Sequence, residues 1–282
     1  MNQYLVQTNK KRYNVNDQNQ GMIQVVSRED LVLRQTKGYN VSDRYTAVKT
    51  SEVLFRLTSS GFNVTKTVLI TPRDKTKEGF QKHMIRLSHN DMQLRGVGDS
   101  RPEIVIVNSH DASTSIKMLI GIYRLVCANG LIVGQTFGGV SIRHVGDVWS
   151  KIDSGLEHIK TRLPEVAESI QAFQGIQLTE SQRFELAREA VKLIVPQNAT
   201  NVNLSSALRV KRSEDSSQDL WTVFNRLQES ALGGGVKYQT EVKNDNVIDI
   251  KNNTTRRIKS IDRQVEVNQG LWDLVTEYSK AA

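Results

Sequence analysis

The sequence predicts an α+β fold, with an antiparallel sheet and flanking helices in the N-terminal half and a mostly helical C-terminal half. Between residues 62 and 124, stretches rich in β-branched residues end at turn signals, which is typical of strands. Beyond residue 145, apolar residues recur with helical spacing. We therefore expect an α+β domain with a basic β-hairpin over residues 1–145 and a mainly helical region over residues 146–282. The two could also pack as one domain.

Two short helices are expected first along the chain. Residues 28–37 form one of them, with Ser27 as its N-cap. Residues 50–60 form the other, where Thr50 is the expected cap and Gly61 the stop.

Strands follow these helices. Residues 62–70 and 80–88 are β-branched or apolar and are joined by a basic turn at 73–79, which predicts a β-hairpin. A short apolar run marks a strand at 103–108. Across residues 115–124, isoleucine and methionine recur at every second position, and this period favours a strand over a helix.

The C-terminal half is predicted to be helical. Four helices are expected, at residues 148–173, 179–195, 216–232 and 262–280. Pro164 should kink or divide the first of them. Thr179 and Gln182 have the spacing of a capping box at the start of the second. Residues 233–255 begin with three glycines and are polar and rich in Asn, so we expect a long loop or a flexible hairpin there.

Composition indicates a folded protein of the cytoplasm. The 282 residues are 38% hydrophobic and 24% charged, which argues against wholesale disorder. The single cysteine, Cys127, lies in an apolar stretch, so we expect a small buried residue in a reducing compartment. No apolar run is long enough to span a membrane, and the N-terminus lacks the apolar segment of a signal peptide. We expect no membrane association.

The net charge is +8, and the excess lies in the first third of the chain. Residues 1–101 carry 17 Lys and Arg against 9 Asp and Glu, whereas the remainder is close to neutral. A basic surface attracts a polyanion, because each neutralised phosphate releases condensed counterions. Alternatively, scattered lysines only keep the chain soluble. Charge alone leaves both interpretations open.

Two short segments hold most of the side chains that could carry chemistry. The residues are Asn108, Ser109, His110, Asp111, Arg143 and His144. His110, Asp111 and His144, with Asp147, could ligate a metal if the segments meet. The alternative, which we favour, is a strand-end turn whose polar side chains satisfy backbone groups. No glycine motif for phosphate binding is present, which argues against a nucleotide hydrolase, and no cofactor is expected.

Basic residues form two further candidate sites. The predicted hairpin carries Lys66, Arg73, Lys75, Lys77, Lys82 and Arg86, with Phe80 and His83 interleaved, and Arg95 follows. Cations beside flat side chains suit single-stranded nucleic acid, although a solvated outer face has the same composition. Arg256, Arg257 and Lys259 precede the last predicted helix. They either meet phosphate or pair with carboxylates such as Glu266.

Several stretches resemble the domain-of-unknown-function family 932, in its phage-encoded branch. They are NSHD at residues 108–111, RLVCANGL at 124–131, IRH at 142–144, DRYTAV at 43–48, LWTVFN at 220–225 and TRRIKSIDR at 255–263. The resemblance covers most of residues 40–280 and departs from the commoner pattern at Ala112, where many relatives have glycine. Members are encoded by phages, plasmids and other mobile elements. The resemblance implies a protein of the infected or host bacterial cytoplasm, and it supplies no catalytic residues.

The leading hypothesis is a nucleic-acid-binding protein of a phage or mobile element. By likeness to phage single-strand annealing proteins, we expect single-stranded DNA as the partner, a homo-oligomer, and a role in recombination or replication. One alternative is an interaction protein that captures a host factor, in anti-defence or host takeover. Another is a metal-dependent enzyme using His110, Asp111 and His144, and we favour an enzyme least.

Overall fold

A computed structural model of the chain describes most of its residues. These are residues 12–16, 23–27, 32–33, 35, 37–38, 41–89, 100–124, 130–133, 139–244 and 247–281. They divide into two compact units. The first unit comprises residues 1–87, 106–117 and 141–152, and the second comprises residues 88–105, 118–140 and 153–282. Most of the predicted helix at 28–37 lies outside the described residues, as do Arg95 and Cys127.

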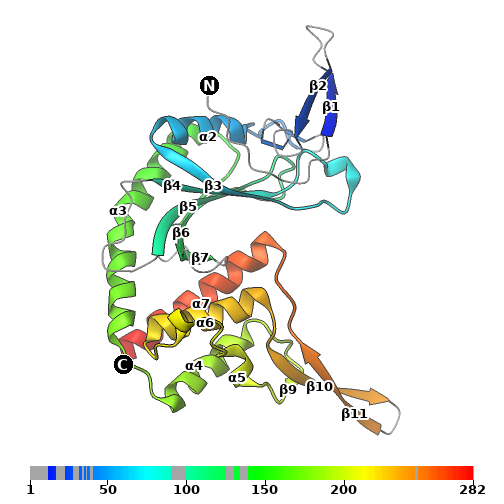
Figure 1. Cartoon of the computed structure of the whole chain (residues 1–282). Coiled ribbons are helices and arrows are strands. Elements are labelled where there is room, and N and C mark those ends of the chain that lie inside the picture. The colour runs from blue at the N-terminus through cyan, green and yellow to red at the C-terminus, as the bar shows by residue number, and fades with distance from the viewer. Residues whose placement is uncertain are drawn as a thin grey trace. The chain divides into compact units, whose positions relative to one another are not determined.

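One six-stranded sheet carries most of the strands (Figure 1). Its members are β3 (Phe62–Leu69), β4 (His83–His89), β5 (Ser100–Asn108), β6 (Ile116–Arg124), β7 (Gly130–Val133) and β8 (Val140–Ile142). From β3 to β7 each strand pairs with the next along the chain, and β8 pairs with β6. The antiparallel sheet and its helices confirm the predicted α+β class.

The central strands are buried on both faces. In β5, the run from Ile104 to Val107 is at most 1% exposed. In β6, the predicted apolar face, which includes Ile116 and Met118, is buried, and so is Leu119 of the opposite face. The sequence of such a strand is a continuous apolar run, because neither face of the strand is exposed to water.

The predicted β3–β4 hairpin is present, but its second strand begins at His83 instead of residue 80. Residues 75–80 close the turn, because a single 3₁₀ turn (Lys75–Lys77) is followed by a bond from the Phe80 amide to the Lys77 carbonyl, 3.0 Å. Helix α2 (Thr50–Ser59) packs against β3. Gly61 lies at φ +87°, the left-handed conformation expected after a helix end.

Helices form most of the second unit. They are α3 (Val148–Gly175), α4 (Glu180–Lys192), α5 (Leu204–Ala207), α6 (Leu220–Gly233) and α7 (Ile261–Ala281). The first residues of α3 belong to the first unit, and the rest of that helix belongs to the second. Pro164 lies inside α3 without dividing it. The predicted capping box at Thr179 and Gln182 is formed. Helix α6 starts at 220 instead of 216, because Asp219 is its N-cap and accepts a bond from the Thr222 amide, 2.9 Å.

Aromatic side chains hold these helices together. Trp272 of α7 lies 5.4 Å from Phe173 of α3 and meets Phe224 of α6 edge-on at 6.1 Å, both between ring centroids. Trp221 stacks on Phe224 at 5.6 Å. Each such pair contributes about 1 kcal/mol beyond the area that it buries. Trp272 is fully buried, so it is the centre of this core.

Residues 233–255 form a hairpin, one of the two predicted alternatives. Strands β10 (Lys237–Asn244) and β11 (Val247–Thr254) pair antiparallel, and the short β9 (Ala199–Thr200) adds to β10. Figure 1 shows this hairpin extending away from the helices of the second unit. A further hairpin, β1 (Arg12–Asn16) with β2 (Ile23–Ser27), was not predicted. None of the helices in the described part of the chain is long and apolar enough to cross a bilayer.

Candidate functional site

A buried polar cluster in the first unit is centred on Asn108, at the end of β5. Its amide nitrogen donates to the Thr50 hydroxyl at 3.0 Å. Its amide oxygen accepts from the Ser109 backbone N–H at 2.8 Å and lies 3.0 Å from Nε2 of His144. The Ser109 N–H fixes which way the amide points, because the opposite orientation would set two donors against each other. Asn108 therefore joins the start of α2 to the segment after β8.

Thr50 brings two more histidines into this cluster. Its hydroxyl lies 2.8 Å from Nε2 of His83 and 3.4 Å from Nε2 of His110. Nδ1 of His83 faces the Gln81 carbonyl at 3.0 Å and therefore carries the proton, so Nε2 of His83 accepts from Thr50. The prediction that Thr50 caps α2 was wrong: Lys49 is the N-cap position, and Thr50 is the first helical residue, fully buried. Its hydroxyl serves the long-range network instead.

Burial keeps these imidazoles neutral. It lowers the pKa of His83 to about 4 and, with the neighbouring His83 and His144, the pKa of His110 to about 3. Burial also lowers the pKa of His144, partly offset by the Thr46 carbonyl. Neutral imidazole is the form that ligates metals. Among the described residues, however, no three His, Cys, Asp or Glu side chains are grouped as metal ligands would be.

His144 faces an oxygen at each ring nitrogen. Nδ1 lies 3.3 Å from the Thr46 carbonyl, and Nε2 lies 3.0 Å from the Asn108 amide oxygen. A neutral imidazole has one N–H, so it donates to one of these at a time. Tyr45 stacks on the ring, with centroids 4.5 Å apart, and its hydroxyl donates to the Ser109 carbonyl at 3.2 Å. Burial and the Asp111 charge raise the pKa of Tyr45 to about 12, so the phenol keeps its proton.

The remaining residues that were predicted for this polar cluster stabilise the turn after β5 or are exposed to solvent. Asp111 accepts from the Ser113 N–H at 3.0 Å and pairs with Lys77 at 3.7 Å. Burial would raise the pKa of Asp111, but these partners outweigh it and the pKa falls below its usual value. Ala112 adopts φ +58°, so the left-handed turn forms with an alanine at this position. Arg143 is exposed. The segments do meet, and the cluster that they make is a hydrogen-bonded frame.

The cations of the β3–β4 hairpin are only partly available. Arg73 and Lys75 are exposed in the turn and make no ion pair with any described residue. Lys77 pairs with Asp111. His83 was expected on the same surface but is fully buried in the polar cluster. Lys66 is exposed, whereas Phe80, Lys82 and Arg86 are half-buried, and all four have contacts within the protein.

A second cationic site lies in the second unit, at residues 256–259, which we call the basic segment. Its backbone is tied to the end of α6 by a bond from the Ile258 amide to the Leu232 carbonyl, 2.9 Å. Arg256, Arg257 and Lys259 are exposed, and their side chains form no ion pair within the described part of the chain. Glu266, which was a possible partner, pairs with Arg263 at 2.6 Å.

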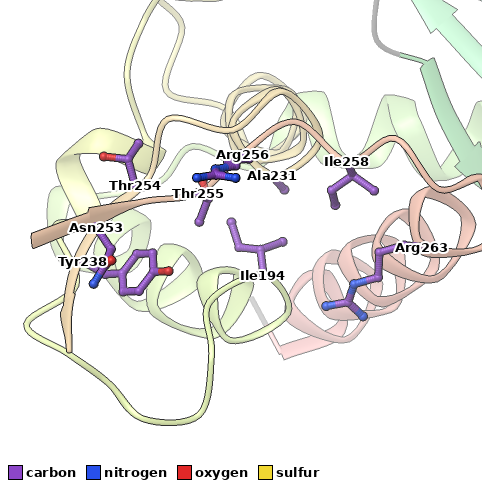
Figure 2. A pocket seen from close by; sticks show the side chains of 9 residues that line it. All are labelled: Ile194, Ala231, Tyr238, Asn253, Thr254, Thr255, Arg256, Ile258 and Arg263. Atoms are coloured by element: carbon purple, nitrogen blue, oxygen red, sulfur yellow. The ribbon is translucent and has the colours of Figure 1, made fainter. Parts of the chain in front are cut away.

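A pocket of about 360 Å³ adjoins the basic segment (Figure 2). It is lined by Ile194, Ala231, Tyr238, Asn253, Thr254, Thr255, Arg256, Ile258 and Arg263. In the view of Figure 2, Arg256 lies between Tyr238 and Asn253 on one side and Arg263 on the other. The lining contains several hydroxyls and no carboxylate, and of its two guanidinium groups Arg256 makes no ion pair with a described residue, whereas Arg263 is already bonded to Glu266 and to the Leu193 carbonyl; Arg256 is therefore the group that suits an anion.

A neighbouring pocket of about 560 Å³ is rich in carboxamides. Its lining residues are Asn201, Asn203, Lys237, Tyr238, Gln239, Asn252, Asn253 and Thr254. None of these residues was predicted as a site. One feature of the sequence could have indicated this pocket. Two polar stretches are separated by only two residues, Asp245 and Asn246, and this spacing is typical of a tight hairpin.

Comparison with known proteins gives a family and two relatives. The family model for Domain of unknown function (DUF932) matches residues 39–272. Two proteins of Escherichia coli (strain K12), UPF0380 protein YafZ and UPF0380 protein YfjQ, are each 32% identical to this chain over 253 residues. Each alignment covers 88% of this chain and 89% of the relative. No solved structure matches the chain.

Proposed function

The chain belongs to the Domain of unknown function (DUF932) family, and from its site chemistry we propose that it binds nucleic acid, with single-stranded DNA as the preferred ligand. The basic segment is the main contact, and Arg73 and Lys75 of the first unit are an additional one. The protein acts in the recombination or replication of a phage or mobile element. This role rests on the likeness to annealing proteins.

The observation that carries the proposal is the set of uncompensated cations in the basic segment. Arg256, Arg257 and Lys259 lie within four residues of one another, and none has a carboxylate partner among the described residues. Elsewhere in the second unit, exposed cations such as Lys160 and Lys192 are paired with carboxylates one helical turn away. Unpaired cations on a fixed backbone are available to phosphates, and each phosphate bound releases counterions.

The burial of helix α6 favours single-stranded over double-stranded nucleic acid as the ligand. Duplex sequence is commonly read by a helix laid in the major groove. Helix α6, which leads into the β10–β11 hairpin, is buried along most of its length, including Arg226 and Gln228. The exposed cations lie instead on a turn and on an extended segment, the kind of surface that tracks a single strand.

The test is the salt dependence of binding to a fluorescent single strand of about 16 nucleotides, with a duplex of equal length as the control. The triple variant Arg256→Ala/Arg257→Ala/Lys259→Ala should weaken binding at least tenfold. It should also lower the slope of log affinity against log salt by about 2, since each lost single-strand phosphate contact removes about 0.7.

A matched variant separates the site from net charge. Lys160→Ala/Arg162→Ala/Lys192→Ala removes three positive charges from the same unit, each of which has an ion-pair partner. This variant should bind nearly as the parent does. Equal losses in the two triple variants would show that only net charge matters. Absence of binding by the parent protein at low salt would overturn the proposal.

A further inference from the structure

We infer that the base of the β10–β11 hairpin is a track for single-stranded nucleic acid, in which phosphates lie on Arg256 at the cationic pocket and base edges meet the adjoining carboxamide pocket. The inference rests on the proposed function and adds to it the part of the ligand that each surface contacts. It predicts that bases, as well as phosphates, contribute to affinity.

The two pockets are continuous. Tyr238, Asn253 and Thr254 line both of them. Tyr238 and Asn253 are cross-strand partners near the end of the hairpin that joins the helices, since the pairing there ends at Lys237 and Thr254. A ligand that fills the cationic pocket therefore reaches the carboxamide pocket without leaving the surface.

The carboxamides are held in a head-to-tail row that runs from Asn201, directly after β9, across β10 to β11. The Asn201 amide nitrogen donates to the Gln239 amide oxygen at 2.9 Å, and the Gln239 nitrogen donates to the Asn252 oxygen at 3.0 Å. The register explains the row, because Gln239 pairs with Thr200 of β9 on one side and with Asn252 of β11 on the other. The internal bonds fix how each amide group points.

The two ends of this row remain available to a ligand. The amide oxygen of Asn201 and the amide nitrogen of Asn252 form no hydrogen bond within the part of the chain that the structure describes, and both residues are exposed. An acceptor and a donor of carboxamide type are the groups that pair with the polar edges of bases. The row therefore offers neutral hydrogen bonding beside a cationic pocket, matching the neutral bases and charged backbone of a nucleotide chain.

The rest of the hairpin argues against insertion into a duplex. Two-stranded ribbons that read the major groove insert their exposed faces between phosphates. The outer half of this hairpin carries the exposed Glu241, which a phosphate backbone would repel. The row from Asn201 to Asn252 lies instead toward the base of the hairpin, where α5 packs against β10. Only an unpaired strand presents its bases there.

The experiment compares two fluorescent single strands of equal length and charge, one with normal bases and one with abasic sites at its central positions. Asn201→Ala/Asn252→Ala should lower affinity for the normal strand about tenfold and leave affinity for the abasic strand, and the salt slope, unchanged. Asn198→Ala removes an exposed carboxamide that lines neither pocket and should have no effect. Asn198→Ala should melt as the parent does, whereas Asn201→Ala/Asn252→Ala should melt slightly lower, because Asn201 has a positive φ, +43°, and two side-chain hydrogen bonds are lost.

The outcomes separate the two proposals. If Asn201→Ala/Asn252→Ala binds both strands as the parent does, or loses both equally, the base contacts are refuted while nucleic-acid binding stands. If the parent binds duplex as tightly as single strand, the single-strand assignment is overturned. If the triple variant of the basic segment binds as the parent does, the basic segment is not the main contact and the track is refuted. If the parent binds neither strand even at low salt, the proposed function fails together with this inference.

Discussion

Replacing Gly234 by alanine tests how the basic segment is held in place. Helix α6 ends at Gly233, and Gly234 follows at φ +80°. A Cβ at this position would lie 2.6 Å from the Thr255 carbonyl oxygen, 2.7 Å from the carbonyl carbon of Arg256 and 2.9 Å from the amide nitrogen of Arg257. All three are backbone atoms, so no side-chain rotation relieves the contact.

The expected cost has two parts. Gly234 has φ +80° and ψ −177°, a conformation that is essentially restricted to glycine, and an alanine there costs about 1–3 kcal/mol. Forcing a methyl group into a filled backbone contact adds about 1–3 kcal/mol. Gly235 is the matched control: it also has a positive φ, +107°, but an added Cβ there meets nothing within 4 Å. Gly235→Ala therefore carries a conformational cost without a close contact, and the larger loss in Gly234→Ala includes the cost of the contact.

Urea unfolding of the full chain and single-strand binding are the two assays. Gly234→Ala should lower the free energy of unfolding by about 2–6 kcal/mol and weaken binding several-fold, because Arg256 and Arg257 move with the displaced backbone. Gly235→Ala should cost about 1 kcal/mol and bind as the parent does. Equal stability and unchanged binding in the two variants would refute the view that close approach at Gly234 positions the basic segment.

Three further predictions concern stability. Because burial holds the pKa of His83 and His110 below the unfolded value of about 6.5, the unfolded chain binds protons first and stability falls as the pH drops from about 6.5 toward 4. The loss by pH 5 is on the order of 2 kcal/mol for each of the two imidazoles, and urea midpoints that stay constant between pH 7 and pH 5 would contradict it. Asn108→Ala leaves buried donors without partners and should lower unfolding free energy by about 2–4 kcal/mol, whereas a loss below about 1 kcal/mol would show that the cluster does not hold the fold. Thr179→Ala removes the capping box of α4 and should cost about 1 kcal/mol, which Thr179→Ser should largely restore in a thermal melt.

The candidate sites differ in how far sequence reasoning could find them. The basic segment was predicted from Arg256, Arg257 and Lys259, because a run of cations is visible in the sequence. Its lack of carboxylate partners could not be predicted, since Glu266 was a possible partner in the sequence and pairs instead with Arg263, one helical turn before it. The carboxamide pocket was missed altogether. Asn201 and Asn252 are 51 positions apart, and only the register of β9, β10 and β11 brings them into one row.

What the sequence determined by itself was the type and order of most elements. The period of two in β6 and the capping box of α4 depend on neighbours within a few residues, so they can be recognised from the sequence alone. Only the tertiary structure decided which polar side chains meet. Thr50 has the sequence context of a helix cap, yet its hydroxyl bonds His83, 33 positions away, because the packing of α2 on the sheet buries it against the end of β5. A buried hydroxyl takes whichever partner the packing supplies, since leaving it unpaired costs more than any local preference.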